Sequence, residues 1–377
     1  MSVHFRPLFS IDQFNLLGRD FWIILISSEI ENMKVALKIL AQALLLSLVM
    51  SALTACSTEP QKPGIKAPPV PKKKFRIATL VKVDGIPWFA RMRVGVDRFA
   101  WETGQDSFLV GPARADGALQ AQMVDELIKQ GIDALCIVPF SASAVEPALK
   151  RARERGIVVV AQEAANIEHA NIIIEPFDCR AWGKHLMDQL AASMNEQGDY
   201  AIILGSYHSQ SHVEWRDAAV SYQLEKYPEM KLVTDPVEDH DNAARSYAEA
   251  KDLLTKFPNL KGILGLTMAS CPSSALAVET MGLKNRVSVV GVSLVSACKS
   301  YLETGSIKAI SFWDPAEAGY AMNEAALKLL QGQEIRTGSD LDAKGYLSLR
   351  RDKTRHNLFF GKGWIDVTKQ NMGNYPY

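Results

Sequence analysis

The chain has 377 residues, of which 42 are Lys or Arg and 42 are Asp or Glu, so its formal net charge is zero. This balance gives no indication of a polyanion such as nucleic acid as a partner. Hydrophobic residues make up 47% of the chain and charged residues 22%, which argues against both a disordered chain and a polytopic membrane protein. The length predicts about two domains.

The first 55 residues have the layout of a leader. Lys34 and Lys38 precede an apolar stretch over residues 39–55, and the letters LTAC end this stretch at Cys56. A basic region, an apolar region and small residues in this order are typical of a secretory signal peptide. The last four letters resemble the lipobox of bacterial lipoproteins, which implies cleavage before Cys56 and acylation of its thiol. A single membrane-spanning anchor is the alternative interpretation, and Met33 is an alternative start.

A proline-rich segment follows the leader. Residues 57–74 contain five prolines and end in three lysines. Such a segment buries no core and predicts an extended, semi-rigid spacer. We therefore expect a leader over residues 1–55 and a lipidated Cys56 with its tether over residues 56–74. The lysines fit a solvated linker, with contact to anionic lipid as the alternative.

Short apolar runs alternate with segments of helical period from Phe75 onward. Runs without polar alternation predict strands that are covered on both faces, and the segments between them are long enough for crossover helices. We expect strands over residues 77–81, 134–138, 157–161, 171–174, 201–204, 262–266, 287–292 and 309–312. The predicted fold class is α/β, with two doubly wound parallel-sheet lobes. Such sheets bind ligands at the carboxyl ends of their strands.

The sequence motifs of several enzyme classes do not occur in the chain. It has no phosphate-binding loop, no Gly-x-Gly-x-x-Gly motif and no Gly-x-Ser-x-Gly elbow. His208 and His212 are four residues apart and could share a metal on a helix, but no HExxH motif accompanies them. We therefore expect neither a metal nor another cofactor.

Three stretches resemble the type I periplasmic sugar-binding proteins of the ribose-binding superfamily. They are QGIDALCIVP at residues 130–139, PALKRARERGI at 147–157 and SFWDPAEAGY at 311–320. Within that superfamily the chain is most similar to the autoinducer-2-binding and rhamnose-binding subgroup, which also has Lys in the first strand and Trp in the 211–215 region. The resemblance implies two hinged lobes that trap a small polar solute and an ATP-binding-cassette (ABC) permease that receives it.

The resemblance also implies three crossings of the chain between the lobes. We place them near residues 163–166, 312–315 and 344–348. The N-terminal lobe is then expected over residues 75–163 and 315–345, and the C-terminal lobe over residues 164–314 and 346–377.

A sugar-like ligand needs aromatic faces and charged or amide groups around it. Lys82 matches the ligand-binding Lys of the subgroup. Glu163 stands where the subgroup has Asp, and Gln162 replaces its Trp, so we expect a pocket of different size or hydroxyl preference. The alternatives are a solvated lysine at 82 and a hinge ion pair at 163.

Trp215 matches the subgroup, whereas Ser211 and His212 replace an acid and an amide of the autoinducer-2 receptor. This departure argues against autoinducer-2 itself as the ligand. Trp88 and Phe89 are expected to face the cleft, with ordinary core packing as the alternative. The full set of expected ligand contacts is Lys82, Trp88, Phe89, Gln162, Glu163, Ser211, His212, Trp215, Thr267, Trp313 and Asp314.

The remaining cysteines show no paired CxxC spacing. Cys136 and Cys298 are expected to be inert packing residues. Cys179 and Cys271 are a candidate disulfide pair in an oxidising compartment.

The predicted function is that of a monomeric, substrate-binding lipoprotein of an ABC-type importer, lipid-anchored to a membrane of the bacterial cell envelope at its periplasmic or extracytoplasmic face. Its ligand is expected to be a pentose, deoxyhexose, polyol or autoinducer-2-like solute. A receptor that docks to a chemoreceptor or sensor kinase is the alternative. An enzyme that uses Lys82, Glu163 and Asp314 as acid and base is a third, less favoured hypothesis.

Overall fold

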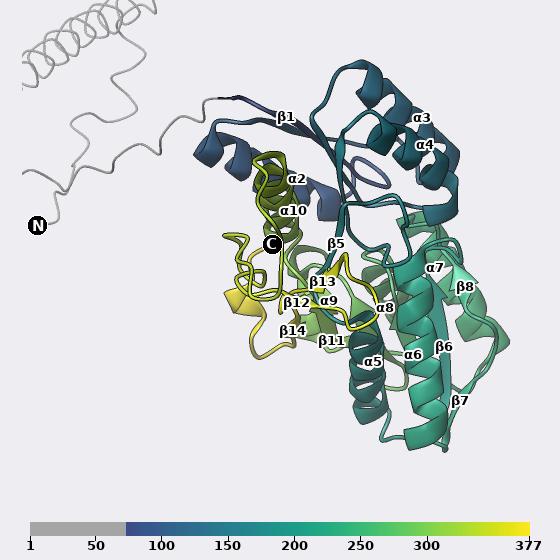
Figure 1. The fold of residues 1–377 in the computed structure, drawn as a ribbon. Coiled ribbons are helices and arrows are strands. Elements are labelled where there is room, and N and C mark those ends of the chain that lie inside the picture. The colour runs from purple at the N-terminus through teal and green to yellow at the C-terminus, as the bar shows by residue number, and fades with distance from the viewer. Residues whose placement is uncertain (1–72) are drawn as a thin grey trace, which may run out of the picture. The chain divides into compact units, whose positions relative to one another are not determined.

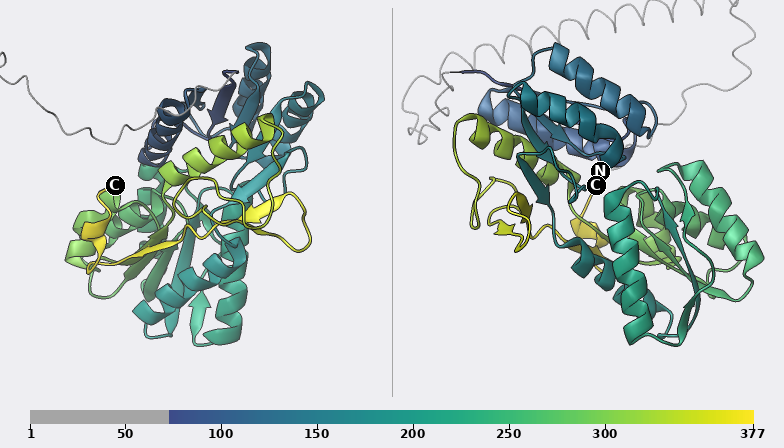
Figure 2. Two further views of the ribbon diagram at one scale, coloured as in Figure 1. Left: turned by 60° about the vertical axis from the view of Figure 1, so that its left-hand side comes forward. Right: turned by 45° about the vertical axis from the view of Figure 1, so that its right-hand side comes forward.

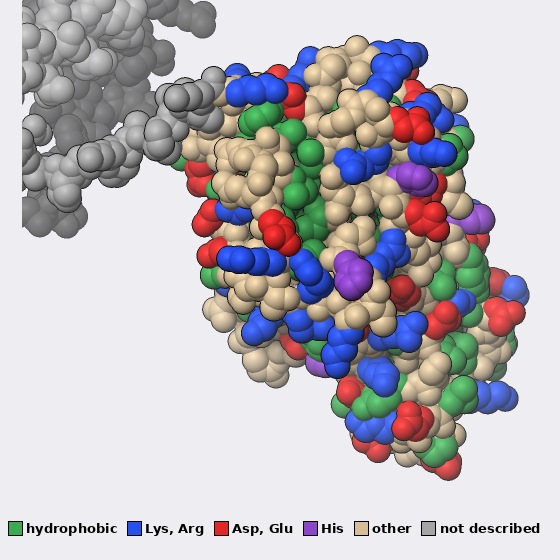
Figure 3. Space-filling model, in the orientation of Figure 1, with side chains coloured by type: hydrophobic (Ala, Val, Ile, Leu, Met, Phe, Trp, Pro, Cys, Tyr) green, Lys and Arg blue, Asp and Glu red, His purple; other side chains and the backbone are tan. Residues whose placement is uncertain are grey.

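The computed structural model of the protein describes residues 73–377. The predicted leader, Cys56 and all but the last two residues of the tether lie outside this range. Within the described residues, no helix has the length and apolar character needed to cross a membrane. Figure 3 shows basic and acidic side chains interspersed over the face that it presents, in keeping with the zero net charge.

Two sheets of seven strands each form the framework (Figure 1). The first has the order β12-β13-β5-β4-β3-β1-β2, and its neighbours are parallel except for β12 and β13. Its strands are β1 (Arg76–Leu80), β2 (Asp106–Val110), β3 (Ala134–Ile137), β4 (Val158–Ala161), β5 (Ile172–Glu175), β12 (Arg350–Arg351) and β13 (Leu358–Phe360).

Helices cover both faces of the first sheet. Helices α2 (Pro87–Thr103) and α10 (Pro315–Leu330) pack together on one face, and α3 (Gly117–Lys129) and α4 (Ala142–Glu154) pack together on the other (Figures 1 and 2). Every residue of β3 and β4 is buried. This explains why these strands are uninterrupted apolar runs in the sequence.

The second sheet has the order β14-β11-β10-β9-β6-β7, and β8 also pairs with β6. Only β14 runs antiparallel to its neighbour, β11. The strands are β6 (Gly198–Leu204), β7 (Met230–Leu232), β8 (Val237–Glu238), β9 (Leu260–Gly265), β10 (Ser288–Val292), β11 (Ile307–Phe312) and β14 (Ile365–Val367). The helices are α5 (Cys179–Ser193), α6 (Gln210–Lys226), α7 (Ala243–Lys256), α8 (Ser270–Thr280), α9 (Val295–Thr304) and the short 3₁₀ helix η2 (Met372–Asn374).

Side-chain caps fix where several helices begin. Asp116 accepts hydrogen bonds from the backbone N–H groups of Ala118 and Leu119 at 2.9 and 3.1 Å. Asp178 and Asn242 cap α5 and α7 in the same way. Each cap satisfies N–H groups that the first turn of a helix leaves without a partner.

The predicted fold class is confirmed, but two of the three expected crossings are wrong. The chain passes between the sheets after β5, between β11 and α10, and between β13 and β14. Only the crossing between β11 and α10 lies where we expected it, near residues 312–315.

The expected lobe boundaries are corrected accordingly. Strand β5 pairs with β4, so the first lobe continues past residue 163 to residue 175. Strand β13 pairs with β5, so residues 350–360 also belong to the first lobe and not to the second. The last part of the chain, yellow in Figure 2, thus runs along both lobes before β14 joins the second sheet.

The four cysteines of the described residues are buried and free. The candidate disulfide between Cys179 and Cys271 is therefore not formed. Burial raises the pKa of the Cys179 thiol well above its usual value, which makes it a poor nucleophile.

Close packing of α2 against α10 requires glycine at position 95. A Cβ atom added to Gly95 would lie 1.8 Å from the backbone oxygen of Ala316. We expect Gly95→Ala to lower the free energy of unfolding by about 1–3 kcal/mol because the two helices must separate. This would happen although Ala favours a helix over Gly by about 1 kcal/mol.

Chemical denaturation measures this change. Gly373→Ala is the matched control, because its added Cβ meets no atom within 4 Å. A Gly95→Ala protein as stable as the unchanged protein would contradict the packing described here.

Candidate ligand-binding site

A small cavity, with about 20 Å³ of space for the centres of water-sized spheres, lies between the lobes at the carboxyl ends of strands from both sheets. The first lobe contributes residues that follow β1 and β4, and the second contributes residues that follow β6, β8, β9 and β10. The lining residues are Lys82, Ile86, Trp88, Phe89, Glu163, His212, Trp215, Asp241, Leu266, Thr267, Met268, Val292 and Trp313.

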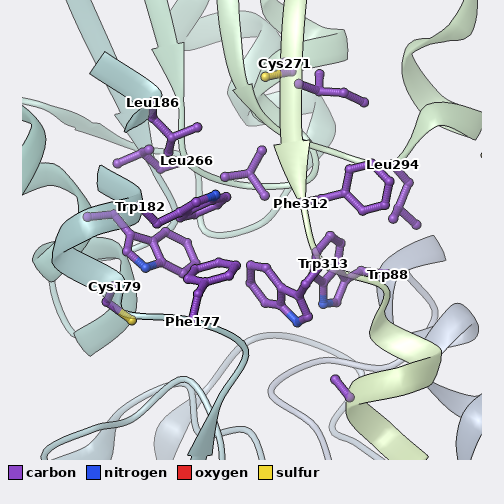
Figure 4. Close-up of a cluster of buried hydrophobic side chains, with 14 of the residues drawn as sticks. Trp88, Phe177, Cys179, Trp182, Leu186, Leu266, Cys271, Leu294, Phe312 and Trp313 are labelled. Atoms are coloured by element: carbon purple, nitrogen blue, oxygen red, sulfur yellow. The ribbon is translucent and has the colours of Figure 1, made fainter. Parts of the chain in front are cut away.

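The aromatic residues that line the cavity belong to a larger cluster of buried side chains, in which Figure 4 labels Trp88, Phe177, Trp182 and Trp313. The ring centres of Trp88 and Trp313 are 4.7 Å apart, and Trp313 contacts Trp215 at 5.8 Å. Trp182 packs behind Trp215 at 4.7 Å and stacks on Phe177 at 4.6 Å. Rings from the first lobe, a crossing segment and the second lobe are thus in continuous contact.

Lys82 and Glu163 form a buried ion pair at the centre of the site. Lys82 Nζ donates to Glu163 Oε2 at 3.3 Å, and the two side chains are only 6% and 4% exposed. Burial opposes the charged form of Lys82, but the carboxylates of Glu163, Asp241 and Asp239 outweigh it and raise the pKa of Lys82. The lysine therefore remains a cation inside the closed cleft, which removes the alternative of a solvated loop lysine.

Glu163 is held in an unusual backbone conformation. Its φ is 57°, in the left-handed region that non-glycine residues seldom adopt. Glu175 stabilises this turn, because its carboxyl accepts hydrogen bonds from the N–H groups of Glu163 and Ala164 at 3.3 and 3.1 Å. Burial, together with the charges of Glu163 and Glu214, raises the pKa of Glu175 to about 8.

The opposite lobe contributes a second carboxylate, that of Asp241, which also lies on a left-handed residue supported by a buried acid. Asp241 and the preceding His240 both have left-handed backbones, with φ of 55° and 52°. Asp239 accepts a hydrogen bond from the N–H of Asp241 at 2.9 Å and one from the hydroxyl of Thr267 at 2.7 Å. Burial and the Asp241 carboxylate raise the pKa of Asp239 to about 7.

His212 is a neutral hydrogen-bond donor in the site. Its Nδ1 accepts the backbone N–H of Gly205 at 3.2 Å, so the ring proton is on Nε2. Burial and the nearby charge of Lys82 lower the pKa of His212 well below its usual value. Gly205 makes this arrangement possible, because an added Cβ would lie 2.6 Å from the His212 ring and 2.9 Å from Asp241 Oδ2.

Four buried polar atoms of cavity-lining residues have no hydrogen-bond partner within the described part of the chain. They are Glu163 Oε1, Asp241 Oδ2, Trp215 Nε1 and Trp313 Nε1. Buried polar atoms are almost always paired in folded proteins. Glu163 Oε1 and Asp241 Oδ2 are acceptors that a solute with hydroxyl groups would satisfy, whereas the Trp215 indole N–H lies beside the Cys179 thiol, which does not line this cavity.

The structure brings together most of the side chains that the sequence predicted for the site. Those that line the cavity are Lys82, Trp88, Phe89, Glu163, His212, Trp215, Thr267 and Trp313. The described residues contain no cluster of three or more His, Cys, Asp or Glu side chains that could hold a metal ion.

Three of the predicted contacts, Gln162, Ser211 and Asp314, do not line the cavity. Gln162 is fully buried, and its amide donates to the Tyr346 hydroxyl at 3.3 Å. Ser211 is buried in the first turn of α6, 3.5 Å from the Ser209 hydroxyl.

Asp314 is held by other parts of the protein. Its carboxylate accepts two hydrogen bonds from Arg91 at 2.9 and 2.6 Å and caps α10 through the N–H of Ala316. It therefore acts as a structural ion pair at a crossing. The acid–base group of Lys82, Glu163 and Asp314 does not assemble in the cavity.

Sequence reasoning missed Asp241. It follows β8, which has only two residues and is too short to register as an apolar run. The signal in the sequence is the acidic run Glu238-Asp239-His240-Asp241 between the strand predicted at 201–204 and the one at 262–266.

Two lobes that enclose a cavity at the carboxyl ends of their strands define a two-lobed binding protein of the type I fold. A model of the periplasmic binding protein domain matches residues 77–334. The chain belongs to the periplasmic binding protein family, which confirms the resemblance seen in the sequence.

Two curated relatives are binding proteins for small polar solutes. The chain is 28% identical over 290 residues to a D-ribose/D-allose-binding protein of Pseudomonas aeruginosa, which covers 74% of this chain and 89% of that protein. It is 25% identical over 251 residues to a xylitol-binding protein of Mycolicibacterium smegmatis, which covers 64% of this chain and 69% of that protein.

A solved structure of LsrB from Clostridium saccharobutylicum in complex with AI-2 has a similar fold. It superposes with a TM-score of 0.75 at 19% sequence identity, covering 80% of this chain and all of the LsrB chain. This likeness supports the fold of both lobes.

The raised pKa of Glu175 predicts how stability depends on pH. A carboxyl whose pKa rises from about 4.5 to about 8 on folding binds more protons in the folded state than in the unfolded state between these values. Its contribution to stability is full below about pH 4.5 and is lost as the pH rises through 8. We expect the free energy of unfolding to fall between pH 5 and 8, by up to about 1.4 kcal/mol per pH unit from this group.

Denaturation at several pH values tests this expectation. Glu175→Gln should flatten the slope, and the exposed Glu154→Gln should leave it unchanged. Equal slopes in all three proteins would show that Glu175 does not titrate as its burial implies.

Proposed function

We propose that the protein is a solute receptor that captures a small sugar or sugar-like molecule between its lobes and delivers it to an ABC-type importer. One observation carries this proposal: both lobes line a single aromatic-walled cavity that contains buried polar atoms without partners. No covalent step is needed, because capture and release are changes in the hinge.

Hinge closure follows from how the contacts are divided. Lys82, Glu163 and Trp88 come from the first lobe, whereas Asp241 and Trp215 come from the second. A solute that contacts both sets gains interactions only in the closed state. It therefore shifts the equilibrium toward closure by the difference in its affinity for the two states.

The ligand class rests on the site and on the relatives together. The relatives are named for ribose, allose and xylitol, which are small molecules rich in hydroxyl groups. Indole faces pack on the C–H surfaces of such molecules, and carboxylates bind their hydroxyls. His212, which lines the cavity where the autoinducer-2 receptor has an amide, favours a sugar or polyol over autoinducer-2.

A thermal-shift screen of residues 57–377 against pentoses, deoxyhexoses, polyols and autoinducer-2 tests the ligand class. At a hundredfold excess over its dissociation constant, the ligand should stabilise the folded protein by about 2.7 kcal/mol. Lys82→Met should lose the shift, and the exposed Lys129→Met should keep it. If no member of the panel raises the melting temperature of the unchanged protein, the carbohydrate assignment fails.

We also propose that Cys56 carries the lipid that holds the receptor at the membrane. This proposal rests on the LTAC sequence at the end of the apolar stretch and on the proline-rich tether that follows. A tether keeps the receptor at a high local concentration beside its permease.

Membrane fractionation tests the anchor. Cys56→Ser should move the protein from the membrane to the soluble fraction, whereas Thr58→Ala should not. Full retention of the Cys56→Ser protein would count against the lipobox.

A further inference from the structure

We propose that the captured solute carries a protonated amine in addition to its hydroxyl groups, and that Asp241 binds this amine. This inference rests on the proposed function and narrows it to amino sugars and amino polyols. It follows from the charges and the unpaired atoms inside the closed cavity.

The cavity contains more negative than positive charge. Lys82 is the one Lys or Arg among its lining residues, whereas Glu163 and Asp241 both contribute carboxylates. A third carboxyl, that of Asp239, is fully buried directly behind Thr267. Arg91 adds nothing to this balance, because its guanidinium is paired with Asp314 outside the cavity.

One ammonium group, that of Lys82, serves two carboxylates: it contacts Glu163 directly and also interacts with the charge of Asp241. One negative charge is therefore in excess, and Asp241 Oδ2 is a buried atom without any hydrogen-bond partner in the described chain. His212 does not compensate it, because its ring is neutral. Burial, together with the charge of Asp241, raises the pKa of the neighbouring Asp239 carboxyl to about 7.

The loop that carries Asp241 is built to hold it in this position. Two successive residues with left-handed backbones, His240 and Asp241, are unfavourable unless surrounding interactions stabilise them. The N–H groups of Asp239 and His240 donate to the carbonyls of Leu204 and Gly205 at 2.9 Å each and tie the loop to the end of β6. Gly205 leaves the space that Asp241 Oδ2 occupies.

An ammonium group satisfies this site better than a hydroxyl group does. A hydroxyl donates a hydrogen bond to a carboxylate but leaves its charge uncompensated, and an uncompensated buried charge is costly. An ammonium donates the hydrogen bond and balances the charge. The rings of Trp88, Trp215 and Trp313 add favourable surroundings for a cation, because aromatic faces attract positive charge.

Matched pairs of ligands test the proposal by isothermal titration calorimetry on the full chain in detergent at neutral pH. The pairs are D-glucosamine with D-glucose, D-galactosamine with D-galactose, and 1-amino-1-deoxy-D-sorbitol with D-sorbitol. In at least one pair we expect the amine to bind about tenfold more tightly, because a hydrogen bond between two charged groups exceeds one to a neutral donor by roughly that factor.

Asp241→Asn assigns the effect to one charge. Asn accepts the left-handed backbone readily, so the loop should keep its shape. The ratio of the two affinities should fall to about one in this variant. It should be unchanged in Asp97→Asn, which removes an exposed carboxylate from α2. Should Asp241→Asn fail to fold, Asp241→Gly measured with the same pairs replaces it, because glycine also accepts the left-handed backbone, and its ratio should likewise fall to about one.

The outcomes separate this inference from the proposed function. If the neutral sugar or polyol binds as tightly as its amine in every pair that binds, the inference is wrong and the sugar receptor stands. If the preference for the amine survives in Asp241→Asn, Asp241 is not its binding group and the proposal is overturned. If no member of any pair binds and no compound of the thermal-shift panel raises the melting temperature, the carbohydrate assignment fails together with the inference.

Discussion

The buried ammonium group of Lys82 is the interaction on which the arrangement of the cleft depends. A cation placed among apolar and aromatic side chains is stable only if carboxylates surround it. Glu163 meets it directly, and Asp241 and Asp239 act from the other lobe. In this arrangement of the lobes, carboxylates from both of them compensate the charge of Lys82.

Each lobe positions its carboxylate by the same physical means. A residue with a left-handed backbone carries the acid, and a second buried acid accepts the N–H groups of that turn. Glu175 does this for Glu163, and Asp239 does it for Asp241. The supporting acids have raised pKa values because their own surroundings are apolar. Both lobes thus use the same arrangement, a left-handed residue supported by a second buried acid, to position a carboxylate after a strand.

Much of the fold was predictable because strands that are buried on both faces are uninterrupted apolar runs. Site residues that directly follow such runs, such as Lys82 and Thr267, were predictable for the same reason. Strand β2 was missed because it begins with polar residues and is partly exposed at the edge of its sheet. The lobe boundaries were wrong because the apolar run of β5 does not reveal which sheet it joins.

Long-range pairing explains the other errors. Nothing near Asp314 in the sequence indicates that its carboxylate forms an ion pair with Arg91, which lies 223 residues earlier. Asp241 escaped notice because a two-residue strand leaves no periodic signal. Local patterns thus identify which elements reach the cleft, and only the packed structure shows which side chains remain free there.

Gly205 influences the position of two residues that line the cavity. Because glycine has no side chain, the ring of His212 and the carboxylate of Asp241 occupy the space beside its Cα. Any residue larger than glycine at this position would push both groups toward the ligand. The size of the accepted solute can therefore change, in evolution or in the laboratory, through a residue that never touches it.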